Sequence, residues 1–143
     1  MFVKQISISL DNVPGMFLRV SECLEAEGIN IRAISVADTS DISSVRFVPD
    51  QPDKTATTLR SHGYRVRETN VIAVEIPDHP GALKAVLKPL KEANINVLYL
   101  YPYLGRGESG QPIVIIGVDK NEEALEVLQK NWVHTFGEEI YAL

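Results

Sequence analysis

An internal repeat is the feature that most restricts how this chain can fold. When the sequence is aligned with itself so that Ile6 meets Ile72, the Pro-Gly pair at 14–15 meets the Pro-Gly pair at 80–81. The alignment continues without a gap to Ile29-Asn30 and Ile95-Asn96. Self-similarity at a fixed spacing indicates a duplicated structural unit. We therefore divide the chain into copy 1, residues 1–70, and copy 2, residues 71–143.

Hydrophobic periodicity changes in the same order within each copy. Alternation predicts strands and spacing of three to four residues predicts helices. Gly28 and Asn94 follow the first helix of each copy, where a left-handed C-terminal cap is expected. Copy 1 reads as strand 4–10, a helix after the Pro-Gly turn, strands 29–38 and 42–49, helix 53–62 and strand 64–68. Copy 2 reads as strand 70–76, helix 81–93, strands 95–104 and 112–118, helix 121–131 and strand 138–143.

Each copy is thus a βαββαβ unit, which predicts an α+β fold of two ferredoxin-like modules, each an antiparallel sheet with helices on one face. No linker separates the two, so we expect docked modules. Tyr99, Tyr101 and Tyr103 alternate along one predicted strand and share a face, where we expect them to pack or, alternatively, to contact a partner module.

Composition excludes several classes of function. With 45% hydrophobic and 23% charged residues, the chain is typical of a soluble globular protein. The start "MFVKQISISLDN" lacks the apolar run and small-residue cleavage site of a signal peptide, and no apolar run is long enough for a membrane span, so we expect a cytoplasmic protein without a membrane partner. The net charge of −5 argues against a nucleic-acid partner. The single cysteine, Cys23, and three scattered histidines show no metal-ligand spacing, and no cofactor is expected.

The duplicated turn carries the strongest functional signal. Proline presets the backbone for a helix start, and glycine lets a ligand approach the backbone. Free N–H groups at a helix N-terminus suit a carboxylate. Asn12 offers a donor and an acceptor, whereas an ionised Asp78 only accepts and favours an ammonium group. The turns therefore suit a zwitterion, although helix capping by the two side chains is an open alternative.

The turn after the first strand, together with "LEAEGINI" and "LKEANINV", resembles the ACT domain family of amino-acid-binding regulatory modules. The resemblance covers both copies and implies modules paired side by side in one sheet, with ligands at the seam between one module's turn and its neighbour's second strand. It implies no catalytic activity, and a homodimer or a regulated partner protein. Carried over to this sequence, it implies ligand contacts from Asn12, Val13, Pro14, Gly15, Met16, Asn30, Ile31, Asp78, His79, Pro80, Gly81, Ala82, Asn96 and Val97.

Some of these positions have alternative interpretations. Asn30 and Asn96 begin strands, a position that asparagine disfavours, so each needs a polar partner, either a ligand or nearby backbone. His79 either contacts a ligand or is an incidental loop residue. Some amino-acid-binding family members have a histidine four residues before the proline, where this chain has Leu10 and Ile76, so the resemblance does not specify which amino acid binds.

Two other functions compete with the amino-acid sensor. The fold and the "VPGMFLR" loop also resemble acylphosphatases, with Arg19 as the anion-binding residue, but Pro14 removes one N–H from the loop and copy 2 has Ala85 in place of the arginine. The stronger competitor is an adaptor that docks to a partner protein without any ligand. The turn sequences alone do not separate sensor from adaptor.

Overall fold

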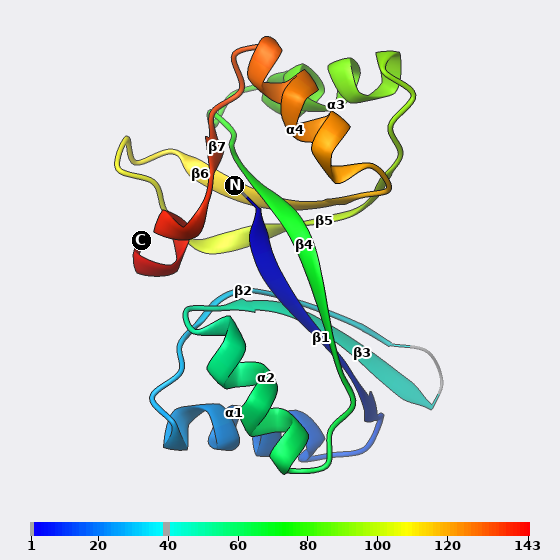
Figure 1. Ribbon diagram of the computed structural model, residues 1–143, viewed down its shortest axis with the longest axis vertical. Coiled ribbons are helices and arrows are strands. Elements are labelled where there is room, and N and C mark those ends of the chain that lie inside the picture. Colours follow the sequence, from blue (N-terminus) through cyan, green and yellow to red (C-terminus); the bar gives the residue numbers. More distant parts are fainter. Residues whose placement is uncertain (1, 39–40) are drawn as a thin grey trace. The chain divides into compact units, whose positions relative to one another are not determined.

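The computed structural model describes residues 2–38 and 41–143, which fall into two compact units (Figure 1). The first unit is Lys4–Thr69. The second unit contains the start of the chain up to Val3 and then Asn70–Leu143. The predicted fold class, two βαββαβ modules, is confirmed.

The first unit follows the predicted element order. Strand β1 pairs antiparallel with β3, and β3 with β2, so that Phe47 of β3 lies opposite Ile6 on one side and Ile34 on the other. Strand β4 also pairs with β1. Helices α1 and α2 lie on one face of this sheet (Figure 1). The bounds are β1 Val3–Asp11, α1 Met16–Ala26, β2 Ile31–Asp38, β3 Ile42–Pro49, α2 Pro52–Ser61 and β4 Val66–Glu75.

Strand β4 continues without interruption into the second unit, where it acts as the first strand. The strand order there is β5-β6-β4-β7, with Ile116 of β6 opposite Ile72 of β4 and Leu100 of β5. Helices α3 and α4 cover one face. The bounds are α3 Ala82–Glu92, β5 Val97–Arg106, β6 Pro112–Val118, α4 Asn121–Lys130, β7 Thr135–Phe136 and the 3₁₀ helix η1 Glu138–Ala142.

The prediction of a final strand at 138–143 is wrong. The last strand is β7, which is two residues long and pairs with β4 through Phe136 opposite Ala73. Residues 138–142 form η1 instead. The hydroxyl of Tyr103 donates to the carbonyl oxygens of Ile140 at 2.8 Å and Leu143 at 2.7 Å, and Ile140 is fully buried. These tertiary contacts hold the C-terminal segment in a turn that its alternating sequence does not indicate.

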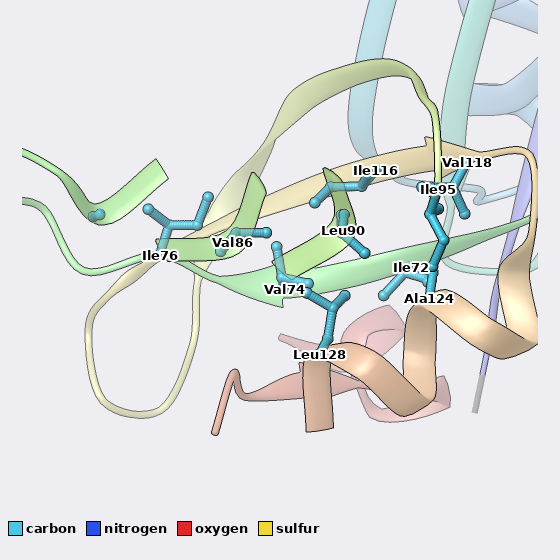
Figure 2. Packing of buried hydrophobic residues seen from close by; sticks show 11 residues of the cluster. Ile72, Val74, Ile76, Val86, Leu90, Ile95, Ile116, Val118, Ala124 and Leu128 are labelled. Atoms are coloured by element: carbon cyan, nitrogen blue, oxygen red, sulfur yellow. The ribbon is translucent and has the colours of Figure 1, made fainter. Parts of the chain in front are cut away.

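Each unit has its own hydrophobic core between helices and sheet. In the second unit, Ile72 and Val74 of β4 face Ala124 and Leu128 of α4, as Figure 2 shows. In the first unit, Ile6, Ile8, Val45 and Phe47 form the sheet side of the equivalent cluster. Two of the alternating tyrosines, Tyr101 and Tyr103, are buried.

Among the described residues, the four α-helices end in the same hydrogen-bonded cap, in which the residue after the C-cap has a left-handed backbone. These residues are Gly28 (φ 68°), Gly63 (φ 86°), Asn94 (φ 59°) and Trp132 (φ 62°). After α4, for example, Val133 N–H donates to Leu128 at 3.0 Å and Trp132 N–H to Gln129 at 3.2 Å. This is the Schellman arrangement. The caps predicted at Gly28 and Asn94 are confirmed, but a tryptophan with positive φ is unusual.

The two copies also differ in the sheet. The β5–β6 hairpin is longer than the β2–β3 hairpin. The number of residues that separates a copy 1 position from its copy 2 equivalent therefore increases after the hairpin. Tyr99 lies opposite Gly117 in the second unit, and the equivalent pair in the first unit is Ala33 opposite Val48. A Cβ added at Gly117 would overlap the Tyr99 ring. The larger side chain of the pair is thus Val48 of β3 in the first unit, but Tyr99 of β5, the equivalent of β2, in the second unit.

Candidate functional site

The two Pro-Gly turns have the same backbone conformation. Gly15, the N-cap of α1, has φ 87° and ψ −8°, and Gly81, the N-cap of α3, has φ 87° and ψ −6°. Such positive φ values favour glycine over any residue with a Cβ. A Cβ at either position would meet no atom within 4 Å, so the backbone conformation rather than crowding requires glycine here.

Because glycine occupies the N-cap of both helices, the N-cap residue itself supplies no side-chain hydrogen bond. Asn12 and Asp78 lie three residues earlier and are exposed. Neither is therefore the N-cap residue. Leu10 and Ile76, at the positions where some family members have histidine, are buried in the cores of their units.

The four helices differ in the charges at their N-termini. Helices α1 and α3, which follow the Pro-Gly turns, have no acidic residue in the first turn. Helix α2 has Asp53 there, and α4 has Glu122 and Glu123. Acidic side chains offset the positive end of a helix dipole. In α1 and α3, the helices that begin at the Pro-Gly turns, no first-turn carboxylate therefore offsets the positive end of the helix dipole.

The turn side chains face solvent. Val13 is 55% exposed, and Met16 is half-buried against the core of the first unit. His79 is exposed, and its Nδ1 lies 2.9 Å from the carbonyl oxygen of Pro80. Since a carbonyl oxygen only accepts, Nδ1 is the donor in this contact. Ala82, by contrast, is buried.

The residues that begin the second strand of each copy are held by an aspartate that the sequence analysis did not identify. Asn30 N–H donates to Asp50 Oδ1 at 2.9 Å, and Asp50 N–H donates to the Asn30 carbonyl oxygen at 2.9 Å. Asn96 and Asp119 repeat the pair at 3.0 and 3.2 Å. Among the described residues, neither asparagine side chain makes a hydrogen bond, so both exposed amides are available to a ligand.

Two polar side chains support the helix ends next to these strands. Gln51 Nε2 donates to the Gly28 carbonyl oxygen at 3.2 Å, and Lys120 Nζ donates to the Asn94 carbonyl oxygen at 3.2 Å. Asp119 and Lys120, with Asn96 and Val97, also line an open depression of about 570 Å³ at the end of α3. In the second unit, the second-strand residues therefore lie in a concave surface.

Within one copy, the turn and the second-strand residues do not form one site. Helix α1 separates Gly15 from Asn30, and α3 separates Gly81 from Asn96. Each helix has 11 residues, which corresponds to a length of about 16 Å. A single free amino acid cannot contact both ends of such a helix. Each copy thus supplies two separate half-sites.

A further polar cluster lies beside the turn of copy 2. Glu75, at the end of β4, accepts a hydrogen bond from the Ser109 hydroxyl and lies 2.7 Å from His134 Nδ1. The Ser109 hydrogen bond, with a contribution from His134, holds the pKa of the Glu75 carboxyl below its usual value despite partial burial. Glu75 is therefore ionised near neutral pH.

The described residues contain no group of three or more histidine, cysteine or acidic side chains that could hold a metal ion. Over the same part of the chain, no helix is long and apolar enough to cross a membrane. Cys23 is a free thiol, half-buried on α1 rather than fully in the core.

Comparisons with known proteins agree with this architecture. Residues 1–142 match the family model of the ACT domain pair. Protein BT0572 from Bacteroides thetaiotaomicron is 30% identical and has a TM-score of 0.92, over 100% of this chain and 98% of that one. No curated protein matches the sequence. The chain belongs to the ACT domain pair family.

More distant structures share the fold. The regulatory subunit of aspartate kinase from Thermus thermophilus, in a ligand-free form, is 15% identical, with a TM-score of 0.64 over 90% of this chain and 92% of that one. Aspartokinase III from E. coli, in complex with aspartate and ADP, is 17% identical, with a TM-score of 0.59 over 91% of this chain and 32% of its own.

Proposed function

We propose that this chain is a non-catalytic regulatory protein that binds a free amino acid at its Pro-Gly turns. The observation that carries the proposal is the pair of turns with the same left-handed glycine, each followed by a helix without first-turn acidic residues. A ligand carboxylate next to the first N–H groups would occupy the place that acidic side chains take in α2 and α4.

The side chains beside the turns would bind the rest of the ligand. Asp78 accepts hydrogen bonds only, so the turn of copy 2 favours an ammonium group, whereas Asn12 also donates. Val13 and His79 occupy the next position in each copy and would contact different ligand side chains. The two turns would therefore differ in ligand preference.

Each turn needs a second wall, which we assign to the second-strand residues of a neighbouring module. Asn30 and Ile31, or Asn96 and Val97, would supply it, and the exposed amides of Asn30 and Asn96 would hydrogen-bond the ligand. This arrangement follows from the ACT resemblance and from the separation of the half-sites within one copy. The neighbouring module belongs either to the same chain or to a second copy in a homodimer, in a cytoplasmic setting.

Binding would act by selecting one arrangement of the modules. A ligand that contacts two modules stabilises the arrangement in which both walls are in place, and its differential affinity sets the size of the effect. The effect on a regulated partner protein would follow from that shift. Some proteins of this fold are aspartate kinase subunits, so aspartate belongs among the first ligands to test.

A thermal-shift screen of the twenty amino acids tests the proposal. A ligand at 100 times its dissociation constant stabilises the folded state by about 2.7 kcal/mol. The N-acetyl derivative and the amide of any hit serve as controls, because each lacks one charge of the zwitterion. If no amino acid raises the unfolding midpoint at millimolar concentration, the proposal is wrong.

A charge substitution at the helix N-terminus sharpens the test. Phe17 and Leu83 are equivalent, lie in the first turns of α1 and α3, and are 40% and 41% exposed. Leu83→Glu should stabilise α3 by about 0.3–1 kcal/mol while weakening the binding of a carboxylate beside it. Leu83→Gln is the uncharged control. Equal affinity in both variants would argue against a carboxylate at this turn.

An adaptor that binds a partner without a ligand is the second candidate. It is favoured by exposed apolar side chains around the turn of copy 1, where Val13 is 55% exposed, Phe17 40% and Leu18 61%. Exposed apolar patches mark interaction surfaces. Measurement of the molar mass in solution with and without the amino-acid panel separates the two candidates, since an adaptor's association state does not respond to ligand.

A further inference from the structure

The second unit contains a hollow of about 340 Å³ between the first turns of α3 and the segment that connects α4 to β7. Pockets for small ligands have volumes of about 300–1,000 Å³. The α3 side is formed by Ala82, Ala85 and Val86. Copy 1 has the larger Met16 and Arg19 at the positions of the two alanines. The hollow therefore depends on small side chains particular to copy 2.

One end of the hollow is charged. Glu75 lines it, with a side chain that is only 15% exposed. His134 Nδ1, at 2.7 Å, and the Ser109 hydroxyl use two of the roughly four acceptor positions of the carboxylate. Acceptor capacity thus remains for a donor that enters the hollow. A ligand ammonium group is the donor that an ionised carboxylate favours most.

The rim of the hollow carries an exposed aromatic side chain. Trp132 lines it, yet 95% of this residue is accessible to water. Copy 1 has Gly63 at the equivalent position, with no side chain to offer. A bound apolar molecule would cover part of the indole, and the indole face would also favour a nearby cation.

We propose that this hollow is a binding site for a small molecule with a primary ammonium group and a compact apolar body. The ammonium group contacts Glu75, the body lies against Ala82, Ala85 and Val86, and Trp132 covers it from the rim. Aliphatic amino acids belong to this class, so any regulatory consequence of binding rests on the function proposed above. The hollow lies within one unit and needs no second wall.

Trp132 is the only tryptophan and lines the hollow, so its fluorescence reports on binding there. The probes are valine, valinamide, which lacks the carboxylate, and N-acetylvaline, which lacks the ammonium group. Valine and valinamide should change the emission saturably, and N-acetylvaline should not. An emission unchanged by all three probes, or changed equally by N-acetylvaline, overturns the proposal.

Two variants test the walls. Ala85→Met fills the hollow and Glu75→Gln removes its charge, and each should weaken valinamide binding on the order of tenfold or more. Arg19→Met makes the matched change in copy 1 and should leave the titration unchanged. If Ala85→Met does not fold, as judged by circular dichroism, Glu75→Gln decides. Wild-type affinity in a folded Ala85→Met or in Glu75→Gln contradicts the site.

The result also separates this site from the turns. A thermal shift by an amino acid without any change in Trp132 emission supports the turn sites and overturns the hollow. If valinamide binds in the hollow and amino-acid affinity is equal in Leu83→Glu and Leu83→Gln, the result supports the hollow and argues against a carboxylate site at the turn of copy 2.

Discussion

Replacement of Trp132 by glycine should stabilise the protein, although it removes a large apolar side chain. Trp132 has φ 62° and occupies the position that Gly63 takes after α2. A left-handed backbone costs a residue with a Cβ about 1–2 kcal/mol relative to glycine. Glycine also has more conformational entropy than other residues in the unfolded chain. Its loss on folding reduces the stabilisation gained by the substitution by about 0.4–1 kcal/mol.

The indole contributes little to set against this gain. Trp132 is 95% exposed, so only about a twentieth of a surface of roughly 250 Å² is covered. At about 25 cal/mol per Å², the lost burial amounts to about 0.3 kcal/mol. Trp132→Ala, which keeps the Cβ, should therefore lose about 0.3 kcal/mol, and Trp132→Gly should be more stable than Trp132→Ala by about 0.8 kcal/mol.

Urea denaturation followed by circular dichroism measures both variants, because the substitution removes the only tryptophan. Gly63→Ala is the converse control and should destabilise the first unit by about 0.8 kcal/mol. The reasoning is refuted if Trp132→Gly is no more stable than Trp132→Ala. A loss above about 1 kcal/mol in Trp132→Ala would instead show that the indole packs more closely than its exposure indicates.

Three further predictions concern stability. Gly117→Ala should destabilise the folded protein by about 1–3 kcal/mol because the new Cβ overlaps Tyr99. In a double-mutant cycle, Tyr99→Ala should restore part of this loss, and additive effects of the two substitutions would contradict the overlap. Ser109→Ala should lower stability near pH 7, and the loss should shrink as the pH falls below 4.5. A depressed carboxyl pKa stabilises fully above its usual value, and this contribution is lost as the pH falls through the folded-state pKa; urea midpoints measured over this pH range decide. Asp119→Ala should cost about 1–2 kcal/mol, and the equivalent Asp50→Ala a similar amount, whereas unequal losses in chemical denaturation would show that the two aspartates differ in role.

Local sequence signals were sufficient to predict most of the fold. Gly28 and Asn94 indicate helix ends because few residue types tolerate a left-handed backbone, and both have it in the structure. Alternation along residues 4–10 indicates a half-buried strand, and Ile6 and Ile8 are buried there. These signals depend on neighbouring residues only, which is why they can be read without the structure.

The parts that escaped prediction depend on residues far apart in the sequence. Asp50 and Asp119 hold equivalent strands, but they follow hairpins of different length, so the ungapped alignment of the first halves of the copies does not pair them. The C-terminal turn depends on Tyr103, which hydrogen-bonds to Ile140 far along the chain. Trp132 stands where the caps of the other helices have glycine or asparagine, so no local rule identifies it.

The duplication itself separates what the fold needs from what a ligand could select. Left-handed glycines at 15 and 81 recur because the turn requires them, and equivalent core positions keep their apolar character. Asn12 and Asp78 are equivalent exposed loop residues that differ between the copies, as are Val13 and His79, and loops often carry binding specificity. Reciprocal exchange, Asn12→Asp with Asp78→Asn, should therefore exchange the ligand preferences of the two turns.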